Sequence, residues 1–165
     1  MHEWHRSVPI RVTVPGPPKA LERNRTRIVN TKDGRQFVAN YQPAKSRAEH
    51  STIRSIAASI MGNRPPLDCP LELRLVAYMP IPRSWSKRDQ AAALADRIRP
   101  SGKPDADNLL KMAEDGMTGV VWRDDSLVTD TMLWKRYSDR PRLVIEVYAL
   151  ECRPVTAGLF EEVAE

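Results

Sequence analysis

Regular alternation of apolar and polar residues constrains the fold of this chain more than any other feature. In the stretch Leu71–Met79, four apolar side chains at every second position would share one face of an extended strand. Val8–Val14 and Arg142–Leu150 alternate in the same way, and Leu127–Arg136 also favours a strand. Such alternation is typical of strands with one face against a core and the other toward solvent. The sequence therefore predicts a small β-sheet with one buried face.

Three segments between these strands predict helices. Within Pro43–Ile60, apolar residues follow the spacing i, i+3, i+4 and i+7, and Gly62 stands where a helix C-cap belongs. Asp107–Met117 predicts a second core helix. The alanine-rich segment Ser84–Arg99 predicts a short inserted helix with only a thin apolar stripe. The expected fold class is α/β, of the α+β kind: a small mixed sheet with two main helices and a short inserted one.

A hairpin is expected between the first strand and the first helix, because Asp33-Gly34 lies between two short apolar runs. Before it, Arg23, Arg25 and Arg27 occupy every second position. In extended backbone these three side chains would project from one face. Such a row could bind phosphates, or it could simply face solvent.

The size of the chain suits one domain. With 165 residues, 41% of them apolar, we expect a single domain over 1–165, with a core of about 8–150 and a frayed tail at 151–165. Two cysteines, Cys69 and Cys152, form neither a disulfide framework nor a zinc cluster, which favours a reducing cytoplasm. The chain has no apolar run long enough for a membrane span and no signal-peptide pattern at its N-terminus.

Charge is divided unevenly along the chain. Residues 1–104 contain 19 basic and 8 acidic side chains, a net charge of +11, whereas residues 105–165 contain 7 and 13, a net charge of −6. A strongly basic segment favours a polyanionic partner such as DNA. An acidic segment in the same small protein would repel that partner, unless its carboxylates hold metal ions.

Four aspartates from two short segments are the candidate metal ligands: Asp105, Asp107, Asp124 and Asp125. Hard divalent ions such as Mg²⁺ prefer carboxylate and phosphate oxygens, and they can activate water for phosphodiester hydrolysis. The Asp-x-Asp spacing alone is a weak signal, and Asp124 is as compatible with a turn carboxylate as with a ligand. Glu114 and Asp115 are expected on the solvent face of their helix.

Lys111 follows Asp107 by four residues, about one helical turn. Its ammonium group could support charge on a phosphate in the transition state. It could equally form a surface salt bridge with Asp107 or Asp115.

In combination, these residues resemble a known family. Lys103-Pro-Asp-Ala-Asp-Asn-Leu-Leu-Lys111, followed by Gly119-Val-Val-Trp-Arg-Asp-Asp-Ser126 and a β-hairpin, looks like the RusA family of Holliday junction resolvases. Pro15-Gly-Pro-Pro18 is similar to the opening of the family, and Pro80–Arg88 resembles its longer, phage-type members. The resemblance covers roughly Val8 to Leu150.

The resemblance implies a RusA-like fold and a homodimer that cuts four-way DNA junctions by paired nicks, with Mg²⁺ or Mn²⁺. Asp105, Asp107 and Asp125 match the three essential carboxylates of the family. Asp124 matches their acidic neighbour, and Lys111 matches the catalytic lysine. Two departures, Ala106 and the segment Glu114-Asp115-Gly116, leave these ligands unchanged, although Gly116 could end its helix early.

These observations lead to one reading and three rivals. The reading is a metal-dependent endonuclease for four-way junctions, active in DNA recombination and repair, with Arg23, Arg25, Arg27, Lys87 and Arg88 as candidate DNA contacts. The rivals are a non-catalytic DNA-binding module, an enzyme for a small phosphorylated substrate, and a nuclease for other branched DNA.

Overall fold

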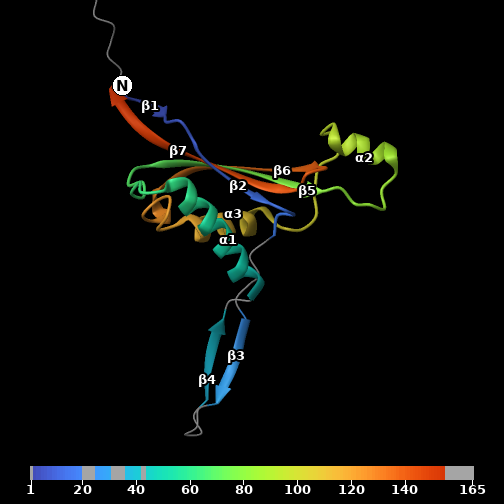
Figure 1. Cartoon of the computed structure of the whole chain (residues 1–165), viewed down its shortest axis with the longest axis horizontal. Helices are drawn as coiled ribbons and strands as arrows, with labels where there is room; N and C mark the ends of the chain where they lie inside the picture. The colour runs from blue at the N-terminus through green and yellow to red at the C-terminus, as the bar shows by residue number, and fades with distance from the viewer. Residues whose placement is uncertain (1, 20–24, 31–35, 42–43, 155–165) are drawn as a thin grey trace, which may run out of the picture.

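A computed structural model describes residues 2–19, 25–30, 36–41 and 44–154 of the chain (Figure 1). The strands are β1 (His2–Arg6), β2 (Ile10–Pro15), β3 (Arg25–Asn30), β4 (Gln36–Tyr41), β5 (Leu71–Pro80), β6 (Val128–Ser138) and β7 (Arg142–Pro154). The helices are α1 (Ala44–Met61), α2 (Lys87–Leu94) and α3 (Ala106–Met117), with a single 3₁₀ turn, η1 (Asp125–Leu127). The predicted fold class, a mixed sheet with two main helices and a short inserted one, is confirmed.

Five strands form one mixed sheet in which β5 is central. It pairs in parallel with β6 and antiparallel with β7, and the far edge of β7 pairs with both β1 and β2. The parallel β5–β6 pair requires a crossover, and α2, α3 and η1 all lie in it. This crossover carries all four aspartates that the sequence suggested as metal ligands.

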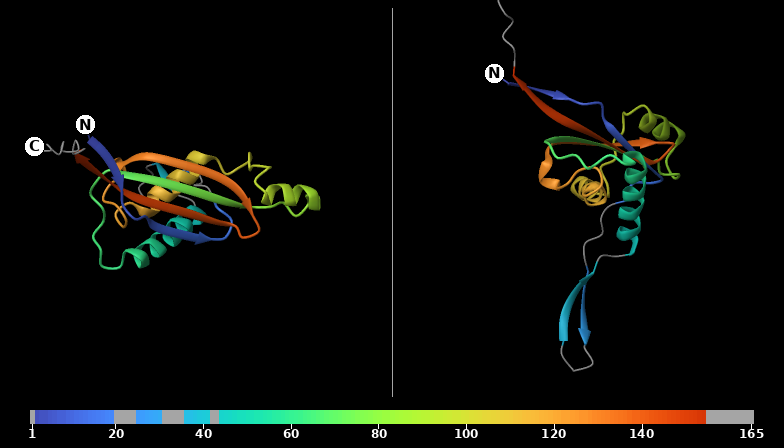
Figure 2. Two further views of the ribbon diagram at one scale, coloured as in Figure 1. Left: turned by 90° about the horizontal axis from the view of Figure 1, so that it is seen from above. Right: turned by 60° about the vertical axis from the view of Figure 1, so that its left-hand side comes forward.

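Helices α1 and α3 cover one face of this sheet (Figures 1 and 2). The predicted face of β5 is fully buried, with Leu71, Leu73, Leu75 and Ala77 all inaccessible to solvent. The two helices approach closely at Gly116, where an added Cβ would lie 2.7 Å from Cγ2 of Ile53. Only glycine fits at this contact. Helix α3 runs through Gly116 to Met117, as the predicted helix Asp107–Met117 did, without the early end that Gly116 could have caused.

Strands β3 and β4 form a separate two-stranded hairpin that projects from the body (Figures 1 and 2). Its two strands agree with the prediction, whereas the Asp33-Gly34 turn lies outside the described residues. After the hairpin comes α1, the long helix that the apolar spacing predicted. Gly62 ends that helix in a left-handed conformation, with φ of +56°, as expected of a C-cap.

Two boundaries differ from the prediction. The expected core began at about residue 8, but β1 already pairs with the end of β7, which runs to Pro154. The inserted helix begins at the Ser86 N-cap, whose Oγ accepts a hydrogen bond from the Asp89 N–H at 3.1 Å, but it ends at Leu94 instead of Arg99. Soon after that end, Asp96 has a left-handed conformation, with φ of +59°, so the helix cannot continue. The predicted tail at 155–165 lies outside the described residues.

None of the described helices is both long enough and apolar enough to cross a membrane.

Candidate active site

Helix α3 presents three charged side chains on one face. Its other face is fully buried against the sheet and α1, through Leu109, Met112, Ala113, Gly116 and Met117. The positions that remain on the outer side include Asp107, Lys111 and Glu114, which are spaced i, i+4 and i+7. Packing of the apolar face therefore fixes the direction in which this charged row points.

Asp105 stands at the N-cap of α3 and is exposed. An aspartate at this position ordinarily accepts a hydrogen bond from a backbone N–H of the first turn. Here the side chain makes no such bond, although the backbone has the extended conformation of a cap. Both oxygens of the Asp105 carboxylate therefore remain available to an external ligand.

The loop after α3 is anchored by Trp122, which is fully buried. Its indole Nε1 donates to Oγ1 of Thr118 at 3.1 Å, and that hydroxyl donates to the carbonyl of Glu114 at 2.8 Å. The loop backbone is also bound to Leu67, through the N–H of Leu67 to the Val121 carbonyl at 2.8 Å and the N–H of Arg123 to the Leu67 carbonyl at 3.0 Å. This anchoring holds the following aspartates against the C-terminal half of α3.

The two adjacent aspartates of this loop differ in their bonding. The Asp124 carboxylate accepts the backbone N–H of Ser126 at 3.0 Å and caps η1. Its hydrogen bonds with Ser126 lower the pKa of Asp124, so it is ionised over a wide pH range. Asp125 is exposed in the first position of η1. Asp124 therefore shapes the turn, and Asp125 presents a carboxylate from it.

Glu114 connects α3 to this turn and was not expected to do so. It is half-buried rather than on the solvent face. Burial raises the pKa of Glu114, the negative charges of Asp125 and Asp115 raise it further, and Lys111 lowers it. The charges of Asp125, in the turn after α3, and of Lys111, on α3, thus both act on Glu114. The i+7 spacing from Asp107 was a signal in the sequence that could have identified it.

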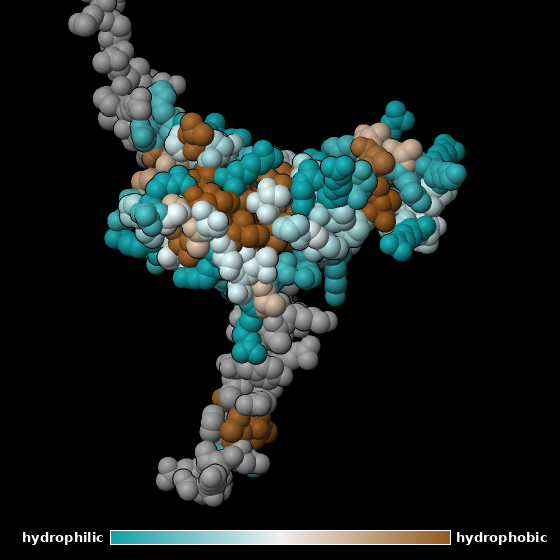
Figure 3. Space-filling view, viewed as in Figure 1, coloured by the Kyte–Doolittle hydropathy of each residue, from teal (hydrophilic) through white to brown (hydrophobic). Residues whose placement is uncertain are grey.

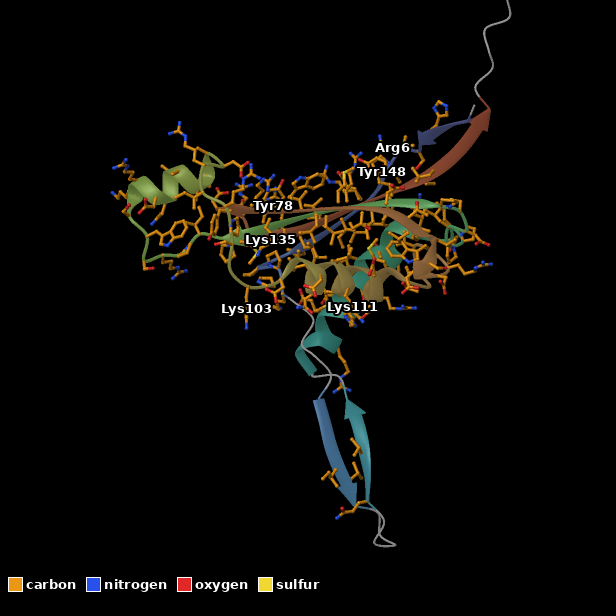
Figure 4. All side chains as sticks on the ribbon, turned by 180° about the vertical axis from the view of Figure 1, so that it is seen from behind. Arg6, Tyr78, Lys103, Lys111, Lys135 and Tyr148 are labelled. Carbon is orange, nitrogen blue, oxygen red and sulfur yellow. The ribbon has the colours of Figure 1, made fainter. Side chains whose placement is uncertain are left out.

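Lys111 forms no ion pair with any described residue, so neither predicted salt bridge is present. Asp115 instead faces α1, with its carboxylate 3.8 Å from Nε2 of His50. The Lys111 ammonium is exposed on the same side of the molecule as Lys103 (Figure 4). It is therefore free to contact a bound anion.

The described aspartates are not assembled into a ligand set, since no three His, Cys, Asp or Glu side chains of the described residues are close enough to hold a metal ion together. The donors themselves are all carboxylate oxygens, which suit a hard divalent ion such as Mg²⁺. The site residues thus fit the chemistry of the expected ion. That their carboxylates bind one ion together stays a prediction.

Comparison with known proteins identifies the family. The model of the family described as "Endodeoxyribonuclease RusA" matches residues 15–148, which include all of these side chains. This chain belongs to the RusA family. A relative in Bacillus subtilis (strain 168), described as "Uncharacterized protein YqaN", is 32% identical over 142 residues, which cover 84% of this chain and 94% of that protein. Because the RusA family is one of endodeoxyribonucleases, the chain is a nuclease.

The candidate DNA contacts of this RusA protein lie on two elements that extend from the body. Arg25 and Arg27 belong to β3 of the hairpin, and Lys87 and Arg88 are exposed in the first turn of α2 (Figure 1). Arg23 lies outside the described residues. The two pairs are therefore held on separate arms, and neither belongs to the carboxylate face of α3.

A pocket of about 530 Å³ lies elsewhere, and Arg6, Glu72, Thr129 and Asp130 contribute to its lining. It contains none of the predicted catalytic residues. The RusA match begins after Arg6. For a nuclease, whose substrate is a long polyanion, an exposed charged face is the more suitable candidate site, and the face formed by α3 and η1 is of that kind.

Proposed function

We propose that this chain is a metal-dependent Holliday junction resolvase, which cuts four-way DNA junctions by paired phosphodiester hydrolysis in recombination and repair. One observation supports this most directly. In a chain of the RusA family, one outer face of α3 carries Asp107, Lys111 and Glu114, and the negative charge of Asp125 helps to raise the pKa of Glu114. Acidic side chains beside a lysine that forms no ion pair within the described part of the chain suit phosphodiester hydrolysis.

Asp105, Asp107 and Asp125 would hold the ion, and Mg²⁺ is the expected one, with Mn²⁺ as a substitute. When bound, such an ion supplies a nucleophilic water and stabilises the departing oxygen. The Lys111 ammonium binds the phosphate and supports the charge that grows on it in the transition state. Asp124 keeps the turn in place through its bond to Ser126.

The enzyme would act as a homodimer, since two symmetry-related sites suit two opposed strands of a junction. The hairpin arginines and the start of α2 would bind phosphates of the DNA arms. This division explains the charge of the chain, because the basic elements extend from a body that carries the acidic site.

The test is the substitution Asp107→Asn. We expect cleavage of a synthetic four-way junction in Mg²⁺ to fall by at least 100-fold, since one ligand of the ion is lost. Binding to the junction, measured in Ca²⁺, should be unchanged or tighter, because a negative charge is removed.

Asp115→Asn is the matched control, since it removes the same charge from the same helix but from a carboxylate that faces His50. It should cut at the normal rate. Equal cleavage by Asp107→Asn and the wild type would refute the site. Equal cleavage of four-way, three-way and linear DNA by the wild type would refute the junction selectivity.

A further inference from the structure

Lys135 of β6 binds the loop that leads into the candidate active site. Its Nζ donates to the carbonyl of Gly102 at 2.5 Å and to the carbonyl of Pro104 at 2.9 Å. The second carbonyl immediately precedes Asp105. In Figure 4, Lys135 lies at the sheet, close to the segment that carries Lys103. A single ammonium group thus bridges two carbonyls on either side of Lys103.

The surroundings of Lys135 make these two hydrogen bonds important for it. Lys135 is half-buried, and a buried ammonium needs hydrogen-bond partners or a counter-charge. Its ammonium group donates to two main-chain oxygens of one loop, and no carboxylate of the described residues forms an ion pair with it. Hydrogen bonds from a charged donor are about twice as strong as neutral ones. Lys135 is therefore a strong attachment point for the loop backbone.

The loop has few other attachments. Residues 98–104 have no helix or strand structure, and their main chain makes no hydrogen bond to the main chain of any other described residue. The neighbouring Arg136 binds Asp96 near the start of the loop, with Nε 3.2 Å from the carboxylate. Successive residues of β6 thus hold the two ends of the connection between α2 and α3. The end nearest the active site depends on Lys135.

We propose that Lys135 is a positioning residue for the nuclease reaction, which fixes the first turn of α3 so that Asp105 and Asp107 take up their ligand positions. The inference rests on the proposed function. Asp105 needs such external support because its own carboxylate does not cap the helix. A displacement of about 1 Å in a catalytic group can cost a factor of about 100 in rate.

The test compares three variants. Lys135→Met keeps the length of the side chain and removes its donors, and Lys135→Arg keeps a charged donor. Arg64→Met is the matched control, since Arg64 also donates to two main-chain carbonyls, those of Ile60 at 2.6 Å and Met61 at 3.2 Å, at the end of α1. Each variant is measured for single-turnover cleavage of a four-way junction, junction affinity in Ca²⁺, thermal unfolding, and hydrogen–deuterium exchange without DNA.

We expect Lys135→Met to cut about 10- to 100-fold more slowly at saturating junction, to need more Mg²⁺ for half its maximal rate, and to bind the junction with unchanged affinity. Amides of residues 102–109 should exchange faster in this variant only. Lys135→Arg should recover part of the rate. Arg64→Met should lose as much thermal stability as Lys135→Met, with normal cleavage.

Three outcomes would overturn the proposal. Equal rates for Lys135→Met and Arg64→Met would make Lys135 a structural residue only. Weaker junction binding with a normal rate at saturation would make it a DNA contact. Unchanged exchange over residues 102–109 would show that it does not hold the loop. An inactive wild type would refute the proposed function instead, and the exchange measurement would still decide the role of Lys135.

Discussion

Glu72 is a carboxylate that the folded chain buries almost completely, with 2% of its surface exposed. It is held between two guanidinium groups, with Nε of Arg6 and Nε of Arg74 each 2.5 Å from one of its oxygens. Arg74 also stacks over the ring of Tyr148, at 4.7 Å from its centroid. Arg6 and Tyr148 lie on the face of the sheet opposite the one that faces Lys111 (Figure 4). On this face of the sheet, the Glu72 carboxylate is thus paired with two guanidinium groups, one of which stacks on an aromatic ring.

This pairing predicts acid sensitivity. Burial alone would raise the pKa of Glu72, but hydrogen bonds from Arg6 and Arg74 outweigh it and hold the pKa below its usual value of 4.5. The folded state therefore binds the proton less readily than the unfolded state does. The stability that ionised Glu72 gives to the fold is complete at neutral pH and is lost as the pH falls below about 4.5. Glu72→Gln should lower the free energy of unfolding at pH 7 by about 1–3 kcal/mol.

Urea unfolding at pH 7 and at pH 3.5 measures this difference. The variant should lose less stability on acidification than the wild type does. As a control, Asp139→Asn, which removes an exposed carboxylate from the β6–β7 turn, should behave as the wild type does. If the free energy of unfolding of Glu72→Gln depended on pH as that of the wild type does, Glu72 would not be a source of the acid sensitivity.

Single residues were predictable from the sequence where their role depends on neighbours in the chain. The placement of Asp107 and Lys111 one turn apart on α3 is an example, since helical spacing relates them; their catalytic roles stay a prediction. The burial of Glu72 depends on Arg6, which is 66 positions away. The partners of Lys135 are likewise 31 and 33 positions distant. No local pattern encodes contacts of that kind.

At the scale of elements, apolar periodicity predicted β2, β5, β7 and α1, because burial of one face imposes that periodicity. Start and stop signals predicted α3, and the segment Leu127–Arg136 was also expected to form a strand. Strand β1 was missed, since His2–Arg6 has no apolar alternation and is defined by its pairing with the end of β7. The inserted helix α2 was predicted too long, because alanine propensity continues past the point where the backbone of Asp96 turns away. Tertiary pairing and single dihedral angles thus account for the differences.

The register of the β3–β4 hairpin gives its two faces different chemistry. Arg25 pairs with Tyr41 and Arg27 with Ala39, so these four positions share one face. Ile28 and Val38 pair on the other face, and each is 67% exposed. Figure 3 shows hydrophobic surface on this projecting hairpin. A lone two-stranded hairpin is marginally stable in water, and DNA on the arginine face would stabilise it.

The double substitution Arg25→Gln/Arg27→Gln tests this element. Each lost phosphate contact should reduce the slope of log affinity against log salt by about 1, so the pair should reduce it by about 2. Junction binding at low salt should weaken, while the cleavage rate at saturation and the thermal stability should stay the same. These quantities are measured by fluorescence anisotropy across a salt series and by single-turnover cleavage.

A control with the same net charge is Arg11→Gln/Arg140→Gln, on β2 and in the β6–β7 turn. It should leave the salt slope nearly unchanged. An equal reduction in both double variants would mean that overall charge, and not the hairpin, determines DNA affinity.

At the scale of the whole molecule, the division of charge follows the architecture. The segment of net charge +11 includes the hairpin and α2, which extend from the body, and the segment of net charge −6 includes α3 and η1 within it. Under the proposed function, the basic arms would bind DNA while the body presents its carboxylates to the phosphodiester backbone. With one site in each chain, a junction that is cut on two opposed strands requires two chains.

Mixed dimers test this requirement. Wild-type chains and Asp107→Asn chains carrying different affinity tags are co-expressed, and dimers containing one of each are isolated by sequential purification on both tags. We expect such dimers to cut one strand of a four-way junction and to leave the opposed strand intact, because each strand depends on the site of one subunit. The product should be a nicked junction, whereas wild-type dimers should give two linear duplexes. Denaturing and native gels of the same reaction distinguish these products.

Two linear duplexes from purified mixed dimers would show that one site can cut both strands. Light scattering of the wild type with bound DNA tests the dimer itself, and a monomeric protein mass would contradict it.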